Sequence, residues 1–484
     1  MRTGNSSTRA KPSSSFGTSR SKLRNGATVT ISKLIAIATT AAALCLLVYG
    51  IAAADQQPYL ASALALFTIG LFASGAIPPH VTAIWFFLLA VLAGIAPTET
   101  IFSGFASMGF WMVFGGLLIG IAVRETGLAS RAARAMSNRL GQSYAGNVAG
   151  IIGVGLAFAF IIPSTMGRVI VLMPIVLELA ENQGFQAHSK GRDGFVIALI
   201  FGTLLPAFTL LPSNLPNIVL MGAADSLFGI TLNYAEYMIL HFPLLGLTKA
   251  GLMIALIVAL FGETPRSVDA APVESMPMTG DEKRLVVILA ATLVLWMTDT
   301  VHGIAPGWIS LAAGSACLLP CLGVLRPKMF ETISYGVLLY VAGVIGLGAT
   351  IAASGLGAWL GAFVLDVADF SPGDDARNLG AMTAVSMAVG LAATQASIPA
   401  ILTPLSDSIA AAMGLPLATV LMMQVLGFSS VVFPYQVPPL MVGLSLGGVS
   451  IMTATRFSLL LLFPTVLILL PLDYLWWRIL GYLS

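Results

Sequence analysis

The chain has 484 residues, of which 57% are hydrophobic and only 9% are charged. A soluble domain has about 25% charged residues. This composition excludes a single water-soluble core and predicts an all-α protein that crosses the lipid bilayer many times. The net charge of +2 does not identify a partner, because the placement of charges matters more than their sum in a membrane protein. We expect no nucleic-acid partner.

Residues 1–33 differ in composition from the rest of the chain, since they are rich in Ser, Thr, Gly and Asn and contain basic but no acidic residues. This pattern is typical of a disordered basic tail, although an organelle transit peptide would have a similar composition. The first apolar segment, residues 34–57, is predicted to be the first transmembrane helix.

A helix that spans the bilayer needs about 20 apolar residues, and several apolar segments of this chain are shorter. We therefore pair the short segments into two re-entrant hairpins and two broken helices, which leaves 11 crossings. The hairpins are residues 145–180 and 378–413, and the broken helices are residues 194–223 and 416–449. With the N-terminus in the cytoplasm, most basic loops fall on the cytoplasmic side. If each hairpin were instead two ordinary transmembrane helices, some of the same basic loops would still lie in the cytoplasm, so charge does not separate the two topologies. The short length of the segments favours the hairpins.

The two hairpins have similar spacings at their tips, which we define as residues 164–168 (first tip) and 394–398 (second tip). A proline follows the start of each tip by ten residues, at Pro174 and Pro404. Each tip is followed by a second interruption, at residues 212–217 (first break) and 434–439 (second break). Paired breaks in two halves of a chain point to the binding site of a secondary transporter.

The repeat extends beyond the tips. The spacing between Gly127-Leu128 and Gly355-Leu356 is nearly the same as the spacing between the two tips. We expect one repeat over residues 58–262 (the first half), a cytoplasmic linker over 263–284, and a second repeat over 285–484 (the second half). Each repeat has five crossings, an odd number, so the repeats are predicted to be inverted. A short amphipathic stretch, residues 130–139, is expected to lie on the cytoplasmic interface.

Interrupted helices can bind ions because their ends present unpaired backbone groups, N–H donors at one end and carbonyl oxygens at the other. The polar side chains at the four interruptions are candidate anion ligands: Ser164, Thr165, Arg168, Asn214, Asn217, Thr394, Gln395, Ser397 and Gln436. Five of them, Ser164, Thr165, Asn214, Thr394 and Gln395, are also candidate ligands for a coupling cation. The alternative for each is a helix cap or an interhelical hydrogen bond.

Arg168 is the most informative single residue. A charge near the bilayer centre costs roughly 2.5–3.5 kcal/mol on insertion scales, so such a residue is a functional candidate. Its guanidinium suits a carboxylate or a sulfate. The alternative is a structural pairing with an acid or with backbone carbonyls of the other half. The second half has Ile398 at the equivalent position, so either interaction is one-sided.

Three segments and their counterparts in the second half are similar to the divalent anion:sodium symporter family, within the wider superfamily of citrate, sulfate and dicarboxylate permeases. They begin at Gly115 (GGLLIGIAVRETGLA), at Ser164 (STMGRVIVLMP), at Ser213 (SNLPNIVLMG) and at their counterparts around Gly355, Thr394 and Gln436. The resemblance implies one sodium ion held by each tip and break, an anion between the two tips, and a homodimer that moves by an elevator motion.

The chain departs from the family pattern at both tips. The resemblance implies Ser-Asn-Thr at each tip, but Thr165 and Gln395 replace the Asn, and Met166 and Ala396 replace the Thr. We hypothesise that the guanidinium of Arg168 takes the place of the cation of the first site. A fixed charge would attract the anion without coupling its transport to sodium.

These observations predict a multi-pass protein of the plasma (inner) membrane that transports small anions, such as dicarboxylates, tricarboxylates or sulfate, with sodium or protons as candidate coupling ions. The alternatives are a membrane sensor that binds an anion without moving it, and an arsenite-type exporter of the same superfamily. We expect neither an enzyme nor a cofactor, because no nucleophile–base pair, phosphate loop or metal-ligand spacing is present in the sequence.

Overall fold

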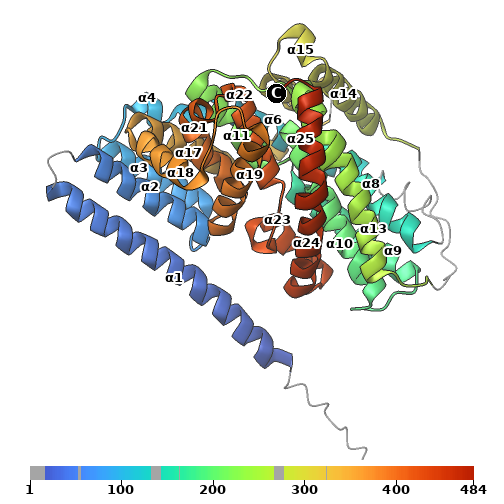
Figure 1. The fold of residues 1–484 in the computed structure, drawn as a ribbon. Helices are drawn as coiled ribbons and strands as arrows, with labels where there is room; N and C mark the ends of the chain where they lie inside the picture. The colour runs from blue at the N-terminus through green and yellow to red at the C-terminus, as the bar shows by residue number, and fades with distance from the viewer. Residues whose placement is uncertain (1–16, 53–55, 132–142, 163, 266–276, 323) are drawn as a thin grey trace, which may run out of the picture.

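The computed structural model describes residues 17–52, 56–131, 143–162, 164–265, 277–322 and 324–484. These residues form helices and loops, and none of them forms a strand. Six described helices are long and apolar enough to cross a membrane: Gln57–Ser74, Met108–Glu125, Lys190–Thr209, Tyr234–Phe261, Tyr335–Ala353 and Ile451–Ile479. The protein is therefore an all-α membrane protein with several apolar helices (Figure 1).

The first half of the chain folds into a series of helices interrupted at both predicted positions. Its elements are α2 (Gln57–Ser74), α3 (Pro79–Leu92), α4 (Thr98–Ile101), α5 (Ser103–Ala106), α6 (Met108–Glu125), α8 (Tyr144–Ile161), α9 (Thr165–Asn182), α10 (Lys190–Leu204), η1 (Pro206–Thr209), η2 (Leu211–Ser213), α11 (Leu215–Phe228), α12 (Tyr234–His241), the π-helix η3 (Phe242–Thr248) and α13 (Lys249–Phe261). The first tip thus lies at the start of α9, and the first break extends from η2 into the start of α11.

The second half has a similar series. Its elements are α14 (Gly280–Met297), α15 (Asp299–His302), α16 (Pro306–Leu318), η4 (Pro327–Thr332), α17 (Tyr335–Ala353), α18 (Leu356–Ala368), α19 (Asp375–Ala392), α20 (Ser397–Leu402), η5 (Thr403–Leu405), α21 (Ser406–Met413), α22 (Leu417–Phe428), η6 (Pro434–Gln436), α23 (Pro438–Gly447), α24 (Ile451–Pro464), the π-helix η7 (Thr465–Leu469) and α25 (Leu470–Ile479). The chain bends by 116° between α19 and the segment Ser397–Met413 at the second tip.

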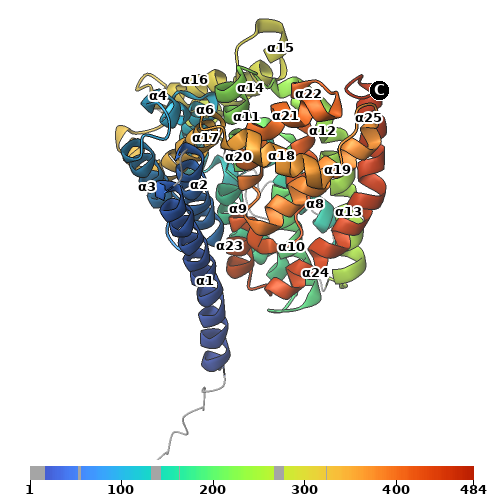
Figure 2. The same cartoon turned by 60° about the vertical axis from the view of Figure 1, so that its left-hand side comes forward.

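The N-terminal helix differs from the sequence-based prediction. Helix α1 (Gly17–Ala52) begins well before residue 34, inside the segment that we expected to be disordered. Lys, Arg and Leu favour helices, whereas hydropathy reports only which part of a helix enters lipid. Helix α1 packs along α2 and projects beyond the other helices (Figures 1 and 2). The amphipathic stretch is described only as far as residue 131, so most of that prediction lies outside the described residues.

The packing of α6 and α17 is reciprocal between the two halves. Helix α6 of the first half packs on α16 of the second, and α17 of the second half packs on α3 of the first. Small residues allow both contacts. A Cβ atom on Gly115 would overlap the backbone of Ser310, and one on Gly343 would lie 2.6 Å from the Cβ atom of Ala83. Gly115 and Gly343 have the same separation along the chain as the two Gly-Leu pairs of the sequence.

Equivalent turns follow equivalent helices. Gly127 after α6 and Gly355 after α17 have φ angles of 77° and 76°. Gly184 after α9 and Gly414 after α21 have φ angles of 76° and 69°. These values lie in the left-handed region, which glycine adopts without steric cost. The backbone therefore repeats its turns at the same spacings as the sequence motifs.

The helices that start at the two tips cross over to the opposite half. Helix α9 packs on α23, and α20 packs on α11. Gly443 in α23 allows the contact with α9 and a second one with α10, because a Cβ atom there would lie 3.1 Å from Cγ1 of Val169 in α9 and would overlap Cγ2 of Ile200 in α10. Each interrupted helix therefore meets the helix that leaves the other tip, and the labels of α9 and α23, and of α11 and α20, lie close together in Figure 2.

Candidate functional site

The first tip begins with a capped helix start. Ser164 is the N-cap of α9, and its Oγ accepts a hydrogen bond of 3.1 Å from the backbone N–H of Gly167. Thr165 is buried, and its hydroxyl donates a long bond of 3.5 Å to the carbonyl oxygen of Ser213 in the first break. Ser164 therefore serves in part as a helix cap, the alternative that the sequence left open, and Thr165 joins the first tip to the first break.

Arg168 lies at the centre of this junction and is fully buried. Its Nη1 donates to the carbonyl oxygens of Ile162 and Ser213, the latter at 3.2 Å. Its Nη2 donates to the Thr165 hydroxyl at 2.9 Å, to the Thr203 carbonyl at 2.9 Å and to the Ser213 carbonyl at 3.2 Å. No described carboxylate lies within ion-pair distance of the guanidinium.

The oxygens around Arg168 form a definable shell, which we call the oxygen cage: the carbonyls of Ile162, Thr203 and Ser213 and the hydroxyl of Thr165. All four belong to the first half of the chain, whereas the structural alternative in the sequence placed the partner carbonyls in the second half. Neutral carbonyl and hydroxyl oxygens are the ligands that hard cations prefer. The guanidinium occupies the cage as a cation would, and only its Nε has no hydrogen-bond partner.

The asparagine side chains of the first break form hydrogen bonds with backbone groups that the interrupted helix leaves unpaired. The Oδ1 of Asn214 caps α11 by accepting a hydrogen bond of 3.3 Å from the N–H of Asn217. The Nδ2 of Asn217 donates to the carbonyls of Ala207 and Leu210, at 3.2 and 2.8 Å. The Nδ2 of Asn214 and the Oδ1 of Asn217 are buried without partners. Each asparagine therefore has at least one structural bond and one atom free to bind a solute.

The second tip and second break also meet. The backbone N–H of Gln395 donates to the carbonyl of Gln436 at 3.1 Å. The Oε1 of Gln436 accepts from the N–H groups of Val432 and Phe433, both at 2.8 Å. Both glutamines are buried, and the side-chain Nε2 and Oε1 of Gln395 and the Nε2 of Gln436 have no partner. A Cβ atom on Gly390 would lie 3.0 Å from the Gln395 Oε1 and 3.2 Å from the Gln436 Nε2.

The two tips resemble each other in exposure. Ser164 and Thr394, the first residues of the tips, are half-buried, whereas Thr165 and Gln395, the second residues, are only 6% and 2% exposed. The hydroxyl of Thr394 is hydrogen-bonded to that of buried Ser397 at 3.0 Å. The first residue of each tip is therefore the more accessible one, and the second contacts the break of its own half.

The tips differ in charge and in spare polar atoms. The first junction contains one buried positive charge, and Ile398 at the equivalent position of the second is apolar and fully buried. The second junction instead contains three unpartnered amide atoms from Gln395 and Gln436. No described group of three His, Cys, Asp or Glu side chains could hold a metal ion. The first junction therefore combines a buried guanidinium with hydroxyl and amide groups, and the second consists of neutral polar groups.

Sequence reasoning did not single out two buried charges elsewhere in the fold. Lys249 in α13 and Asp473 in α25 are 2% and 0% exposed. Each interrupts an apolar segment, which is the signal that could have identified them. They lie outside the tips and breaks.

Comparison with known proteins agrees with this architecture. The family model described as the sodium:sulfate symporter transmembrane region matches residues 28–483. A membrane protein of Cupriavidus necator is 24% identical over 300 residues, which cover 57% of this chain and 58% of the relative. The sodium-dependent dicarboxylate transporter SdcS of Staphylococcus aureus is 23% identical over 331 residues, which cover 61% of this chain and 63% of SdcS. The chain thus spans less than two thirds of these relatives.

The fold also resembles a solved structure. The crystal structure of the Alcanivorax borkumensis YdaH transporter superposes with a TM-score of 0.53 at 18% identity, covering 84% of this chain and 99% of that one. At this identity the likeness concerns the fold alone. Because the family match extends over nearly the whole chain, the protein belongs to the sodium:sulfate symporter transmembrane family.

Proposed function

We propose that the protein is a secondary active transporter of small anions, with di- and tricarboxylates and sulfate as the candidate substrates. Membership of a sodium:sulfate symporter family and similarity to a protein named as a sodium-dependent dicarboxylate transporter support this class of substrate. The protein would work as a homodimer in the plasma membrane, by alternating access.

The proposed topology has 11 crossings and two re-entrant hairpins in an inverted repeat, with a cytoplasmic N-terminus. The 116° bend at the second tip and the reciprocal packing of α6 with α16 and of α17 with α3 support the repeat. In this arrangement α8 with α9, and α19 with α20 and α21, are the hairpins, and α10 with α11 and α22 with α23 are the broken helices.

One observation carries the proposal: each tip bonds to the break of its own half, and the helix that leaves each tip packs on the broken helix of the other half. We infer that the four helix interruptions face one region, and the side-chain amides of Asn214, Gln395 and Gln436 contain buried atoms without partners. Neutral donors beside a buried positive charge favour a solute of negative charge.

Arg168 has the role of a tethered cation in this proposal. Its guanidinium fills the oxygen cage and leaves no carbonyl of the cage for a sodium ion. The positive charge of the first site is then permanent, so it raises anion affinity without tying transport to sodium at that site. A direct contact between Arg168 and the anion is less favoured, because four of its five N–H groups point at protein oxygens.

Counterflow in proteoliposomes tests the proposal. Vesicles loaded with unlabelled succinate, citrate or sulfate should accumulate the same labelled anion, also in sodium-free medium. Binding without counterflow would favour the anion sensor, and movement of arsenite alone would favour the exporter. Counterflow that vanishes without sodium and depends on Thr165 would contradict the role given to Arg168.

A further inference from the structure

The two longest apolar helices of the molecule carry buried ionisable side chains that the anion site does not use. One consists of α12, η3 and α13, and the other of α24, η7 and α25. They pack against each other where α12 and η3 contact α25 and where α13 contacts α24. His241, Lys249 and Asp473 face this contact and are 0%, 2% and 0% exposed. Buried ionisable groups at such positions in membrane proteins mark ion or proton pathways.

Asp473 is the only acid among the three, and like His241 it has no hydrogen-bond partner for its side chain. Neither of its carboxylate oxygens has a hydrogen-bond partner, although the side chain is fully buried. Lys249 interacts with it electrostatically, but the two form no direct ion pair within 4 Å. A charged carboxylate without bonds is costly in this environment, whereas a protonated carboxyl is much less so. The environment therefore favours a group that takes up and releases a proton.

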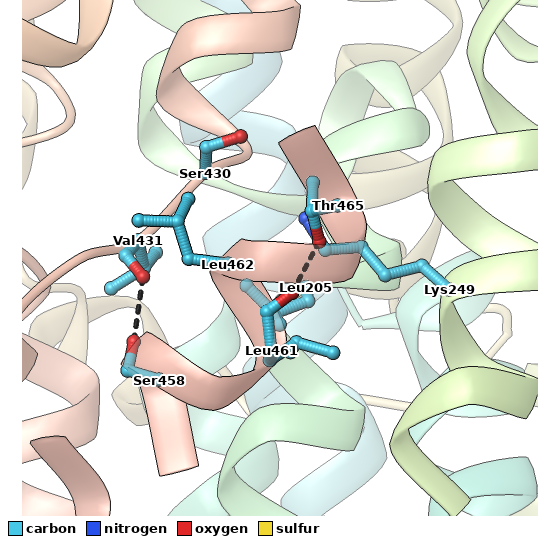
Figure 3. A pocket seen from close by; sticks show the side chains of 8 residues that line it. All are labelled: Leu205, Lys249, Ser430, Val431, Ser458, Leu461, Leu462 and Thr465. Atoms are coloured by element: carbon cyan, nitrogen blue, oxygen red, sulfur yellow. Dashed lines mark hydrogen bonds between the residues drawn. The ribbon is translucent and has the colours of Figure 1, made fainter. Parts of the chain in front are cut away.

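Lys249 links this acid to the second break. Its ammonium donates a hydrogen bond of 2.9 Å to the carbonyl of Ser429, at the C-terminal end of α22. It also borders a cavity of about 10 Å³, lined by Ser430, Val431, Ser458 and Thr465 among others (Figure 3). That volume is at the lower limit for one water molecule. Figure 3 shows the nitrogen end of Lys249 beside Thr465, next to the segment that continues into the second break.

Other ionisable side chains lie on α25 or near it, among them Tyr237, whose ring contacts His241, and Tyr482, whose ring contacts Trp477. His241 packs its ring on Trp477, one turn from Asp473, with centroids 5.6 Å apart, and neither ring nitrogen has a partner. Tyr474 and Arg478 lie on α25 itself, in a cation–π contact. The other charged residues on helices that pack against α13 or α25 lie within the first two turns of those helices: Lys190, Arg192, Asp193, Glu236, Asp375, Arg377 and Arg456.

We propose that Asp473 is the proton-binding carboxylate of a proton-coupled anion transport cycle, with Lys249 as its fixed counter-charge. This inference rests on the proposed transport function. While Asp473 is ionised, the pair is neutral overall. When Asp473 takes a proton from water, the charge of Lys249 is no longer balanced and attracts an anion toward the second break. Proton and anion then favour each other's binding, as linkage requires.

The helix-capping role of Lys249 does not explain Asp473. A lysine at the C-terminal end of α22 is stabilising by itself, because the helix end is partly negative. An unbonded buried acid adds nothing to that contact, and a Leu at position 473 would be the simpler choice for packing. A proton-coupling role therefore explains why an acid is buried at position 473, whereas the helix-capping role of Lys249 does not.

The experiment compares two readouts in the same proteoliposomes. One is accumulation of labelled succinate, or of labelled sulfate where the wild type exchanges that anion, driven by an inward proton gradient without sodium. The other is counterflow at equal pH, which needs no net proton movement. Asp473→Asn should reduce gradient-driven accumulation at least tenfold and keep counterflow within about twofold. Asp407→Asn, which changes an exposed acid of α21, is the matched control and should keep both.

Each outcome decides the question. The proposal would be overturned if Asp473→Asn accumulated the anion as the wild type does. It would also be overturned if the wild type showed normal counterflow but its accumulation did not respond to the pH gradient. Absence of wild-type counterflow would instead refute the transport function. If Asp473→Asn does not fold, Lys249→Met/Asp473→Leu removes both charges, a change that buried pairs often tolerate. Counterflow without gradient-driven accumulation in this double variant supports the proposal. If the double variant shows both counterflow and gradient-driven accumulation, Asp473 is only a counter-ion and the proposal is wrong.

Discussion

Replacing Arg168 with alanine should convert the first tip into a site that responds to sodium. The substitution removes the guanidinium and leaves the oxygen cage around it. The carbonyls of Ile162 and Thr203 lose their donor, and the carbonyl of Ser213 keeps only the long bond from Thr165. A buried polar group left without a partner costs about 1–3 kcal/mol. The direct cost of the two carbonyls is therefore roughly 2–6 kcal/mol before relaxation, and we expect a large fall in the thermal stability of the variant in sodium-free buffer.

Sodium should recover part of that loss, because a cation that enters the vacated cage binds the folded state only. A ligand at 100 times its dissociation constant stabilises by about 2.7 kcal/mol, enough to raise the melting temperature by a few degrees. The assay is a thermal melt of purified protein in detergent, with sodium chloride against choline chloride at one ionic strength. Wild type and Arg168→Lys, which keep a fixed charge in the cage, should show no such shift.

Arg192→Ala is the matched control. Arg192 also donates to a backbone carbonyl, that of Gly447 at 2.8 Å, but it is only half-buried and has no cage around it. Its variant should not respond to sodium. If Arg168→Ala shows no sodium-dependent shift, or if wild type shifts as much as the variant, the guanidinium does not stand in for a cation.

Three further predictions concern packing, the second break and the linker. Gly115→Ala should lower the melting temperature by overlap with α16, whereas Gly120→Ala, with open space at its Cβ, should not. Gln436→Leu should leave two backbone N–H groups without an acceptor, a loss of about 1–3 kcal/mol for each, and should abolish counterflow. The hydrogen bond from Arg131 holds the pKa of Glu282, which precedes the apolar part of α14, below its usual value. The stabilising interaction between Arg131 and Glu282 is therefore present at neutral pH and is lost as the pH falls through that lowered pKa. The difference in melting temperature between Arg131→Gln and wild type should therefore shrink in acid.

Much of the architecture followed from the sequence because it depends on local signals. Prolines and polar residues inside apolar segments marked both tips and both breaks, and helices end or change type at each of them. Glycines at matching spacings marked equivalent turns, since few other residues adopt a left-handed conformation cheaply. The start of α1 was missed, because hydropathy does not report where a helix continues into polar sequence.

The partners of the site residues did not follow from the sequence. Arg168 was identified as a buried charge, but its bonds go to backbone carbonyls, which carry no residue-specific signal. The choice between anion and carbonyls depends on where Thr203 and Ser213 lie in space. Lys249 and Asp473 lie in different halves of the chain, and only the contact between two long helices brings them together.

The most direct test of the central claim is a cryo-electron microscopy structure of the protein with a bound anion, using succinate and its brominated analogue. We predict anion density between Ser164 and Thr394, within hydrogen-bonding reach of Asn214 or Gln395, with the guanidinium of Arg168 still in the oxygen cage. Anion density away from both tips, or a sodium ion in the cage with Arg168 displaced, would contradict the proposed mechanism.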